Sequence, residues 1–510
     1  MAIKIITNNN EITINYTDFP QNALGHLIFT HSALTPRPLC TGIGKCGRCK
    51  VKYLTNIPQL TELEKTLLSQ EEQENNIRLA CKHELQDNTI FEICDDLHKN
   101  STQLILDIDP IQTTIHCNLF IDLGTTSIQW EVANKEKTYV NGQILNPQMI
   151  AGADVMARLY YVNFIEKKQK SLLQECVLDY IKKLLSALQH KNIIIDEILI
   201  GANPAMTAIF LGKESSKLMQ APYQLENKGN NYTKIDNLPP IYTPPQLSAF
   251  IGADACAGFA YILANYPNLQ NFILADLGTN GEFIFYTQQK NYAASIPLGP
   301  ALEGVGMRCG GAVHGKGENI ILDFSLSPFG LSYTCKGTPQ FICGAAYLNL
   351  INILLSTQLI DRQGFFIDSI SPLAKKIQQK IKIENNEKRL YVTENLYICA
   401  EDIENILKVK AAFSSAIEIF MEHNQIENIF LSGSLSQYIP LTTLENLGFL
   451  PKTSKNKTQI LGNTSLKGLI EIKNNPKILT QLIDNIEKTQ IIDLTNQEEY
   501  NSRYIENMHF

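Results

Sequence analysis

The chain has 510 residues, which suits three or four domains at about 150 residues each. Its 44 basic and 51 acidic residues give a net charge of −7, which argues against a nucleic-acid-binding protein, because such proteins present a basic surface. With 44% hydrophobic residues the chain can form a sizeable core, which excludes wholesale disorder. No apolar run reaches the roughly 18 residues of a membrane span, and the N-terminus lacks the apolar block of a signal peptide, so we expect a cytoplasmic protein without membrane contact.

Residues 1–95 have the pattern of a small domain of short strands around a helix, with a long loop that carries cysteines. This arrangement favours a β-grasp, ferredoxin-like domain. Residues 96–116 lack periodicity and contain an Asp-Pro pair, so we predict a linker there. The patterns predict strands over 2–6, 11–16, 50–54, 77–81 and 89–94, and helices over 22–32 and 61–68.

The rest of the chain alternates helical and strand patterns, so the overall class is α+β followed by α/β. Apolar residues at helical spacing predict helices over 172–188 and 402–422, and a strand follows the first of them at 197–200. We assign 117–485 to this α/β domain. Residues 486–510 are polar, and we expect them to form a fraying C-terminal tail.

An internal repeat divides the α/β domain in two. Residues 118–126 (NLFIDLGTT) resemble residues 272–280 (FILADLGTN), and Asp122 and Asp276 occupy equivalent places. Each copy consists of an apolar run, an aspartate, a Gly-Thr turn and a second strand-like run. Two such units at domain-scale spacing predict two similar lobes that face each other.

Four of the twelve cysteines lie close together in the sequence, with the spacing C-x5-C-x2-C and one further cysteine beyond. Four thiolates suit a [2Fe–2S] cluster, and the glycines at 42, 44 and 47 allow the loop to curl and turn backbone N–H groups toward the sulfurs. A structural zinc site and incidental core cysteines are the alternatives. Zinc sites generally combine two close cysteine pairs, whereas Cys81 stands alone, which favours the cluster. The predicted ligands are Cys40, Cys46, Cys49 and Cys81.

The two Asp-Leu-Gly-Thr turns have the residues of a phosphate-binding site. A tight Gly-Thr hairpin after a buried strand exposes backbone N–H groups that bind anions, and threonine hydroxyls add donors. An aspartate at the strand end can hold Mg²⁺ through its waters. The alternative is that both are ordinary glycine-containing hairpins. The predicted phosphate and magnesium residues lie within 122–127 and 276–281: Asp122, Gly124, Thr125, Thr126, Asp276, Gly278, Thr279 and Asn280.

Two further segments complete the predicted ATP site. The strand 428–432 ends in Gly433 and Ser434, where a glycine would let an adenosine lie close to the backbone, although such glycines are common in α/β proteins. Glu303 is the carboxylate of the glycine-rich stretch 299–307. It is a candidate to orient or deprotonate the water that attacks the γ-phosphate. The competing interpretation is a helix N-terminal residue stabilised by the helix dipole.

Taken together, these motifs resemble the reductive activators of corrinoid proteins, which join a [2Fe–2S] domain to an ATPase of the superfamily that includes acetate and sugar kinases, Hsp70 and actin (ASKHA). The likeness covers most of the chain. It rests on LCTGIGKCGRCKV (39–51), RLAC (78–81), IDLGTTS (121–127), NPQMIAGADVMAR (146–158), GANPAMTAIFLG (201–212), IGADA (251–255), ADLGTNGEF (275–283), GPALEG (299–304), ICGAAY (342–347), DIENILKVKAA (402–412) and GNTSLKG (462–468).

The resemblance implies a two-lobed, duplicated ribonuclease H-like ATPase domain in which Asp122, Gly124, Thr125, Asp276, Gly278 and Thr279 form the phosphate and metal group. Asp276 of this group and Glu303 are the predicted catalytic residues. It also implies that ATP hydrolysis assists one-electron reduction of an inactive Co(II) corrinoid to Co(I). The implied partners are a corrinoid protein of a methyltransferase system and a low-potential electron donor. Longer members of the family carry an extra domain where this chain has the short linker 96–116, so a homodimer is an open expectation. Residues 432–436 (SGSLS) are also more polar than the usual version of that motif.

Two other functions fit parts of the pattern. A small-molecule kinase of the same superfamily with a fused ferredoxin domain would produce a phosphorylated acceptor. A redox-sensing regulator that binds ATP would turn it over slowly and independently of any corrinoid partner. An iron–sulfur cluster argues against the plain kinase, because phosphoryl transfer does not use one.

Overall fold

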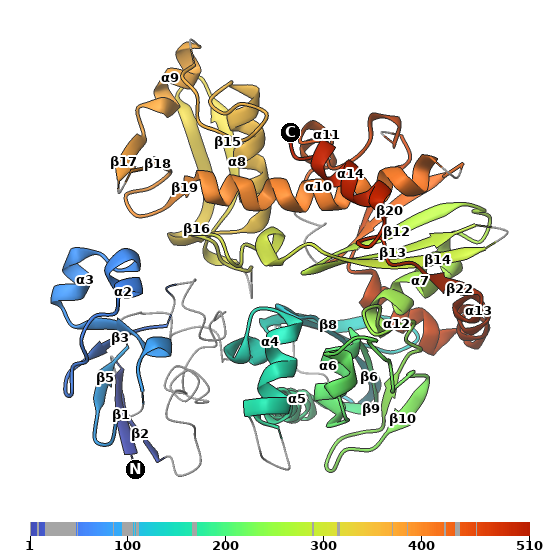
Figure 1. The fold of residues 1–510 in the computed structure, drawn as a ribbon. Helices are drawn as coiled ribbons and strands as arrows, with labels where there is room; N and C mark the ends of the chain where they lie inside the picture. Colours follow the sequence, from blue (N-terminus) through green and yellow to red (C-terminus); the bar gives the residue numbers. More distant parts are fainter. Residues whose placement is uncertain are drawn as a thin grey trace.

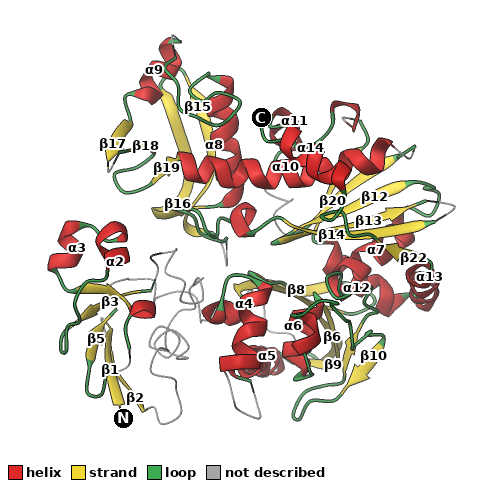
Figure 2. Cartoon of the chain, in the orientation of Figure 1, coloured by secondary structure: helices red, strands yellow, loops and turns green. Residues whose placement is uncertain are grey.

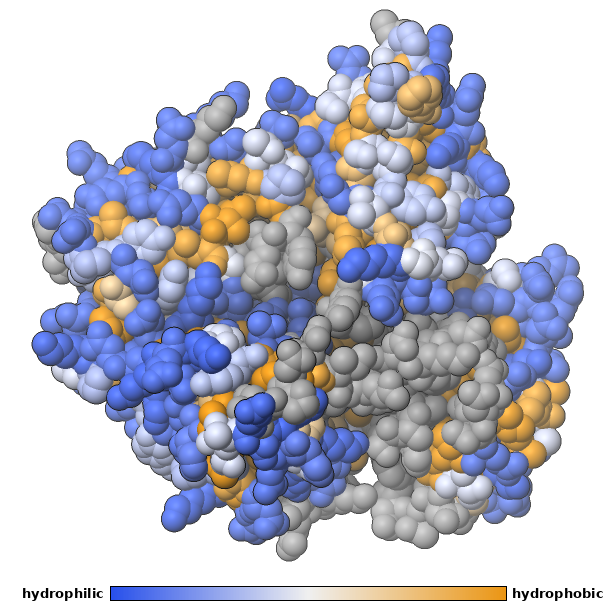
Figure 3. All heavy atoms as spheres, turned by 180° about the vertical axis from the view of Figure 1, so that it is seen from behind, coloured by the Kyte–Doolittle hydropathy of each residue, from blue (hydrophilic) through white to orange (hydrophobic). Residues whose placement is uncertain are grey.

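The computed structural model describes residues 2–7, 10–15, 47, 49–84, 86–93, 106, 108, 112–165, 171–287, 290–313, 317–369, 371–384, 386–422, 425–433, 439–454 and 456–510. Its mixed α/β structure has three main parts, which follow one another along the chain: a small N-terminal sheet, a first lobe and a second lobe (Figures 1 and 2). Hydrophilic side chains cover most of the described surface on the face seen from behind (Figure 3). None of the described helices is long and apolar enough to span a bilayer.

The N-terminal part is a five-stranded sheet with strand order β2-β1-β5-β3-β4. β1 and β5 pair in parallel, and antiparallel pairs flank them on both sides. The predicted hairpin and the later strands are confirmed. The predicted helix over 22–32 and most of the linker 96–116 lie outside the described residues. The elements are β1 (Ala2–Thr7), β2 (Asn10–Asn15), β3 (Lys50–Tyr53), α2 (Glu62–Leu67), α3 (Gln70–Glu74), β4 (Ile77–Leu79) and β5 (Ile90–Glu92).

The first lobe contains a six-stranded sheet with order β10-β11-β9-β6-β7-β8. Its longest helix, α5, is amphipathic and covers the sheet with buried residues spaced three or four apart, such as Leu173, Val177 and Ile181. The elements are β6 (Ile115–Leu123), β7 (Ser127–Ala133), β8 (Thr138–Leu145), α4 (Val155–Tyr160), α5 (Leu172–Gln189), β9 (Ile193–Ala202), α6 (Pro204–Leu211), β10 (Asn231–Thr233) and β11 (Ile241–Thr243).

The second lobe repeats this design in the order β21-β20-β12-β13-β14-β22. In both sheets three consecutive strands form an antiparallel meander, β6-β7-β8 and β12-β13-β14. Two further strands run parallel to the first strand of the meander, β9 and β11 in the first lobe and β20 and β21 in the second. This shared arrangement of five strands agrees with the duplication that the sequence repeat predicted. The sixth strand differs, because β10 lies beside β11 at one edge of the first sheet, whereas β22 lies beside β14 at the opposite edge of the second. The elements are α7 (Ala253–Asn265), β12 (Phe272–Leu277), β13 (Asn280–Tyr286), β14 (Asn291–Pro297), α10 (Ala400–Glu422), β20 (Asn428–Ser432), β21 (Thr458–Gly462), α12 (Thr464–Asn474), α13 (Pro476–Glu487) and β22 (Thr489–Ile491).

A large insertion lies between β14 and β20 of the second lobe. It contains a long two-stranded hairpin and a small three-stranded sheet, and α10 leads from it back to the main sheet (Figure 1). The elements are β15 (Glu318–Ser327), β16 (Gly330–Ile342), α8 (Gly344–Ser356), α9 (Pro372–Gln378), β17 (Ile381–Glu384), β18 (Glu387–Tyr391) and β19 (Tyr397–Cys399). α11 (Leu441–Asn446) follows β20 and packs against α8.

The expected polar tail over 486–510 is wrong. These residues add β22 to the edge of the second sheet and end in α14 (Glu498–Glu506), which packs on α10. Tyr500 and Phe510 are buried, and the ammonium group of Lys410 donates hydrogen bonds to the carbonyls of Asn507 (3.0 Å) and His509 (2.8 Å). The mean composition of the segment is polar, but Leu494, Tyr500 and Phe510 are buried in the core of the second lobe.

The two lobes meet where α7 and α12 cross between the sheets. Glycines permit the close approach, since a Cβ on Gly468 would lie 1.7 Å from the Ala257 carbonyl oxygen, and one on Gly258 would lie 2.6 Å from Thr464 Oγ1. One hydrophobic cluster includes Phe120 of the first sheet together with Phe272 of the second. This shared core brings the ends of β6 and β12 toward each other.

Candidate functional site

The two predicted phosphate hairpins face each other across the junction of the lobes. Asp122 lies one residue before the end of β6, and Asp276 has the same place in β12. Burial raises the pKa of Asp122 to about 7, and the charge of Asp276 contributes to this shift. The two aspartates therefore lie close enough to interact, as the sequence repeat predicted.

Each aspartate is held by a residue of the second lobe. Asp122 Oδ2 accepts a hydrogen bond from Asn463 Nδ2 (2.6 Å), and the carbonyl oxygen of the same Asn463 side chain caps α12 by accepting from the Leu466 N–H. Asp276 Oδ2 accepts from Ser432 Oγ at 3.0 Å. Burial raises the pKa of Asp276 to about 6, and the hydrogen bond from Ser432 opposes this effect.

Asp254 at the start of α7 and Glu282 on β13 add two carboxylates to this group. Burial, together with the charges of Asp122 and Asp276, raises the pKa of Asp254 to about 8. Burial also raises the pKa of Glu282 well above its usual value, with Asp254 and Asp276 adding to the effect. The sequence analysis included both residues in its motifs but assigned them no function. Their only sequence signal is an acidic residue inside an otherwise small or apolar run.

This carboxylate group fits a hydrated divalent cation. All four side chains are partly buried and repel one another, so a bound cation would relieve the repulsion. Within the described ranges, no three His, Cys, Asp or Glu side chains converge closely enough to ligate a metal directly. A Mg²⁺ ion held through its waters is compatible with that spacing, because Mg²⁺ retains several waters in most protein sites.

Glu303 connects the two hairpins. Its Oε2 atom accepts hydrogen bonds from Thr126 Oγ1 of the first lobe and from Thr279 Oγ1 of the second, the latter at 3.4 Å. Burial raises the pKa of Glu303 to about 7, against the opposing charge of Arg158. Glu303 is the last residue of the single 3₁₀ turn Pro300–Glu303 and also lies in its first turn, so the interpretation as a helix N-terminal carboxylate stays a prediction beside the catalytic one.

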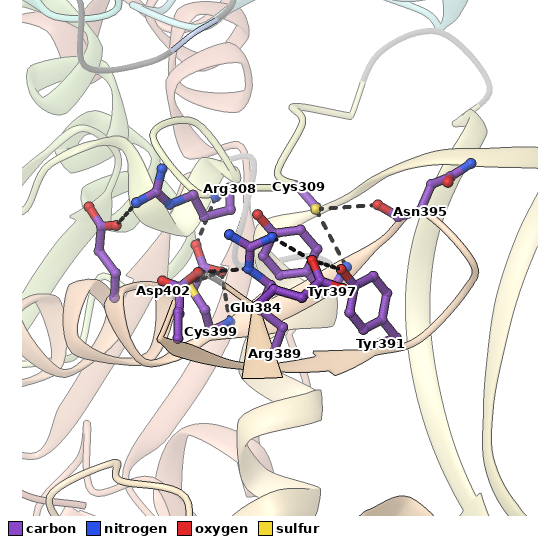
Figure 4. Close-up of polar contacts among 11 residues, drawn as sticks. Arg308, Cys309, Glu384, Arg389, Tyr391, Asn395, Tyr397, Cys399 and Asp402 are labelled. Carbon is purple, nitrogen blue, oxygen red and sulfur yellow. Dashed lines mark hydrogen bonds and ion pairs between the residues drawn. The ribbon is translucent and has the colours of Figure 1, made fainter. Parts of the chain in front are cut away.

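The loop after Glu303 is anchored to the insertion of the second lobe (Figure 4). Asp402, near the start of α10, accepts from the Arg308 N–H at 2.8 Å, and Arg308 also pairs with Glu401. The Tyr397 N–H donates to Cys309 Sγ at 3.4 Å, which ties the loop to β19. These contacts fix the loop that follows Glu303 to the second lobe, whereas Thr126, a hydrogen-bond partner of Glu303, lies in the first lobe.

Gly433 lies beside the second hairpin, with a φ of +100°. A Cβ at this position would lie 2.5 Å from the Leu277 carbonyl oxygen and 2.9 Å from Asp276 Oδ1, so only glycine fits. Ser434, the other residue predicted to bind the nucleoside, lies outside the described residues. Gly124, Gly278 and Asn280 lie in the two hairpins as expected.

Two of the four predicted cluster ligands lie together in the N-terminal sheet. Lys50 of β3 pairs with Leu79 of β4, and the Ala80 N–H donates to the Cys49 carbonyl at 2.8 Å. Cys49 and Cys81 therefore lie at the same end of this strand pair, with Cys81 in the 3₁₀ turn Ala80–Lys82. Cys40 and Cys46 lie outside the described residues.

Glu64 fixes the segment that carries Cys81. This fully buried side chain accepts hydrogen bonds from the Leu79 N–H (2.7 Å) and from His83 Nε2 (2.8 Å), which flank the cysteine on both sides. It also completes a capping box with Thr61 at the start of α2. Burial acts to raise the pKa of Glu64, but the hydrogen bonds from Thr61, Leu79 and His83 outweigh it and lower the pKa below its usual value.

Glu64→Gln should weaken this turn. We expect the local free energy of unfolding around 77–83 to fall by about 1–3 kcal/mol near neutral pH, because charge-assisted hydrogen bonds are lost. Since the folded pKa is lowered, the stabilisation is present above the unfolded pKa and disappears as the pH falls through the folded value, so the variant and the wild type should converge in acid. Hydrogen exchange of these peptides in the intact chain measures the difference. Glu72→Gln, in the matching capping box of α3, is the control, and equal effects of the two variants would contradict this account.

Comparison with known proteins places these features in context. A family model described as the RACo middle region matches residues 117–264, and a model described as the C-terminal domain of RACo, the ASKHA domain, matches residues 270–510. A solved structure titled "Reductive activator for corrinoid, iron-sulfur protein" superposes with a TM-score of 0.67 over 100% of this chain and 98% of that chain. The sequence identity is 18%, so this likeness concerns the fold.

Two curated relatives match at the level of sequence. Corrinoid activation enzyme RamQ of Eubacterium limosum is 26% identical over 378 residues, which is 67% of this chain and 61% of that protein. The [Co(II) methylated amine-specific corrinoid protein] reductase of Methanosarcina barkeri is 22% identical over 391 residues, 68% of each protein. The alignment with RamQ thus spans about three fifths of the length of that relative.

Proposed function

Because the chain belongs to the RACo family of reductive activators of corrinoid proteins, we propose that it uses ATP hydrolysis to drive the one-electron reduction of a corrinoid protein from Co(II) to Co(I). One observation carries the proposal. Glu303 of the second lobe accepts hydrogen bonds from both phosphate hairpins, so a single carboxylate lies where a triphosphate and its attacking water would meet. The curated relatives, whose names refer to corrinoid activation and reduction, support the choice of reaction.

The N-terminal sheet would hold the iron–sulfur cluster. Its central parallel pair β1–β5, flanked by antiparallel pairs, supports assignment of 1–95 to a β-grasp ferredoxin-like domain. The proposed ligands are Cys40, Cys46, Cys49 and Cys81. Cys49 and Cys81 lie at one end of the β3–β4 pair, which fits a shared group. When bound, a [2Fe–2S] cluster supplies one-electron transfer.

The lobes would hold the nucleotide between them. The hairpins at Gly124–Thr126 and Gly278–Asn280 offer backbone N–H groups and hydroxyls to the phosphates, and Gly433 with Ser434 would lie near the nucleoside. Asp122 and Asp276 would hold Mg²⁺ through water. With a pKa of about 7, Glu303 is partly ionised at neutral pH and can accept a proton from the attacking water.

A contact between lobes gives nucleotide turnover a way to affect electron transfer. For one electron, about 59 mV corresponds to a tenfold change in equilibrium, so a donor about 240 mV too weak opposes Co(I) formation about 10⁴-fold. This factor corresponds to about 5.5 kcal/mol, the free energy needed to switch a two-state equilibrium from one extreme to the other. Opening and closing of the lobes around Glu303 would couple that free energy to the corrinoid protein.

The proposed partners follow from this reaction. The substrate is a corrinoid protein of a methyltransferase system, and a low-potential donor supplies the electron. An anaerobic mixture of reductant, Mg-ATP, this protein and a Co(II) corrinoid protein should develop Co(I) absorption and release inorganic phosphate. A phosphorylated small-molecule acceptor would instead identify a kinase. Slow ATP turnover that the corrinoid protein leaves unchanged, with no Co(I), would identify a regulator and contradict the proposal.

A further inference from the structure

Arg158 is a fully buried arginine at the edge of the nucleotide site, and the sequence analysis gave it no function. It lies on α4 in the first lobe. Its Nε donates to the Gly152 carbonyl at 3.1 Å and its Nη1 contacts Met206 Sδ at 3.1 Å. Its Nη2 donates to the carbonyl of Thr125, inside the first phosphate hairpin. The guanidinium thus holds this hairpin from behind.

The bond to Thr125 has a consequence for the next residue. The Thr125 carbonyl and the Thr126 N–H belong to one trans peptide, so the two groups point in opposite directions. With the carbonyl fixed on Arg158, the Thr126 N–H is directed away from the guanidinium, and a charged donor on the carbonyl also polarises the peptide and strengthens its N–H as a donor. Asn203 holds Thr125 from another side, since its Nδ2 donates to Thr125 Oγ1 at 3.2 Å.

Arg158 also acts on Glu303 of the other lobe. Its positive charge opposes the effect of burial on the pKa of Glu303, whereas Asp276 and Glu282 are the negative groups in electrostatic contact with Glu303. Asp154 and Cys176 are the other ionisable groups that interact with Arg158. This guanidinium therefore affects Glu303 in two ways. Its charge acts on the carboxylate directly, and it holds the Thr125 carbonyl next to Thr126, whose hydroxyl donates to the same carboxylate.

We propose that Arg158 is the positioning residue of the nucleotide site: it sets the Thr125–Thr126 peptide for a phosphate and supplies the positive counter-charge that keeps Glu303 between the hairpins. This inference rests on the proposed ATPase function. Arg158 acts on the hairpin through its peptide backbone rather than as a direct phosphate ligand, because each of its three nitrogen atoms has a protein partner: the Gly152 carbonyl, Met206 Sδ and the Thr125 carbonyl. Arg158 acts through the geometry of the Thr125–Thr126 peptide and through the positive charge near Glu303. Both effects are largest in the transition state, when the triphosphate reacts.

Lys410 provides a matched control for burial. It is also a buried cation that donates to two carbonyls, and burial lowers its pKa to about 8, but these carbonyls belong to the C-terminal segment on α10. Arg158→Lys keeps the positive charge, whereas Arg158→Gln removes it. Comparison of these two variants with Lys410→Met separates the effects of charge and position from the effect of burial.

The experiment measures ATP hydrolysis with the Co(II) corrinoid protein present, together with thermal melting. Arg158→Gln should lower kcat about 10²-fold with little change in KM for ATP, because misplacement of a reacting group by about 1 Å costs about that much. Arg158→Lys should recover a large part of kcat. Lys410→Met should lower the melting temperature but should not lower the kcat of the folded protein.

Three results would overturn the inference. They are a kcat within about twofold of wild type in Arg158→Gln, equal kcat in the Gln and Lys variants, or a loss confined to KM. If Arg158→Gln fails to fold, the kcat of Arg158→Lys against Lys410→Met at equal melting temperature decides. Failure of the proposed function is a different outcome, since wild-type protein would then hydrolyse ATP without forming Co(I), while the effect of Arg158 on hydrolysis could still be read.

Discussion

Asp276→Asn should reduce ATP hydrolysis about 10³-fold, or about 4 kcal/mol of transition-state stabilisation, and ATP-dependent Co(I) formation should fall in parallel. The change removes one of the two charges that would hold Mg²⁺ while preserving the size of the side chain and an acceptor for Ser432 Oγ. Phosphate release and Co(I) absorption measure the two effects. Asp323→Asn, which alters an exposed carboxylate on β15, should leave both unchanged.

The same variant should not lose stability. Burial raises the folded pKa of Asp276 to about 6. In the protein without Mg²⁺ and nucleotide, the ionised carboxylate is therefore increasingly destabilising as the pH rises from the usual pKa of an aspartate through 6. At pH 7 without Mg²⁺, Asp276→Asn should therefore melt no lower than wild type. Mg-ATP should raise the melting temperature of wild type and raise that of the variant much less. Hydrolysis within tenfold of wild type, or a large drop in melting temperature, would contradict the assignment of Asp276.

Cys49→Ser should abolish Co(II) reduction and leave nucleotide binding intact. A serine hydroxyl is a poor iron ligand, whereas the backbone bond from Ala80 to residue 49 does not depend on the side chain. Iron and sulfide content, visible absorption and nucleotide affinity of the anaerobically prepared protein measure the two halves of this expectation. Cys335→Ser, on the β16 hairpin of the second lobe, is the control that should keep the cluster. Full iron content in Cys49→Ser would remove Cys49 from the ligand set.

Much of this architecture could be predicted from local patterns. α5 and α10 begin and end within two residues of their predicted bounds, because in a long amphipathic helix the apolar spacing repeats over several turns. The repeat around Asp122 and Asp276 was visible because both lobes use the same residues at the same strand end. The C-terminal segment was mispredicted because α14 is short and charged, and only its contacts with α10 show which side is buried.

The charge balance of the site could not be read from the sequence. Arg158 and Asp254 come from elements distant in the chain, and only the assembled lobes bring them near Asp122, Asp276 and Glu303. Glu282 lies opposite Asp276 in the β12–β13 pair, but the sequence does not show that it is buried there with the other carboxylates. Glu64 shows the same limit in the N-terminal sheet. Its capping box is visible as a local Thr-x-x-Glu pattern, but its bonds to Leu79 and His83 depend on the β3–β4 pair.

The most direct test of the account is the final ratio of Co(I) to Co(II) at a donor potential held constant, with and without ATP. The account predicts that ATP, but not ADP, raises this ratio above the value that the donor potential sets, with each tenfold increase corresponding to about 59 mV. The same final ratio in both conditions, reached faster with ATP, would mean that hydrolysis does not drive the electron and would contradict the account.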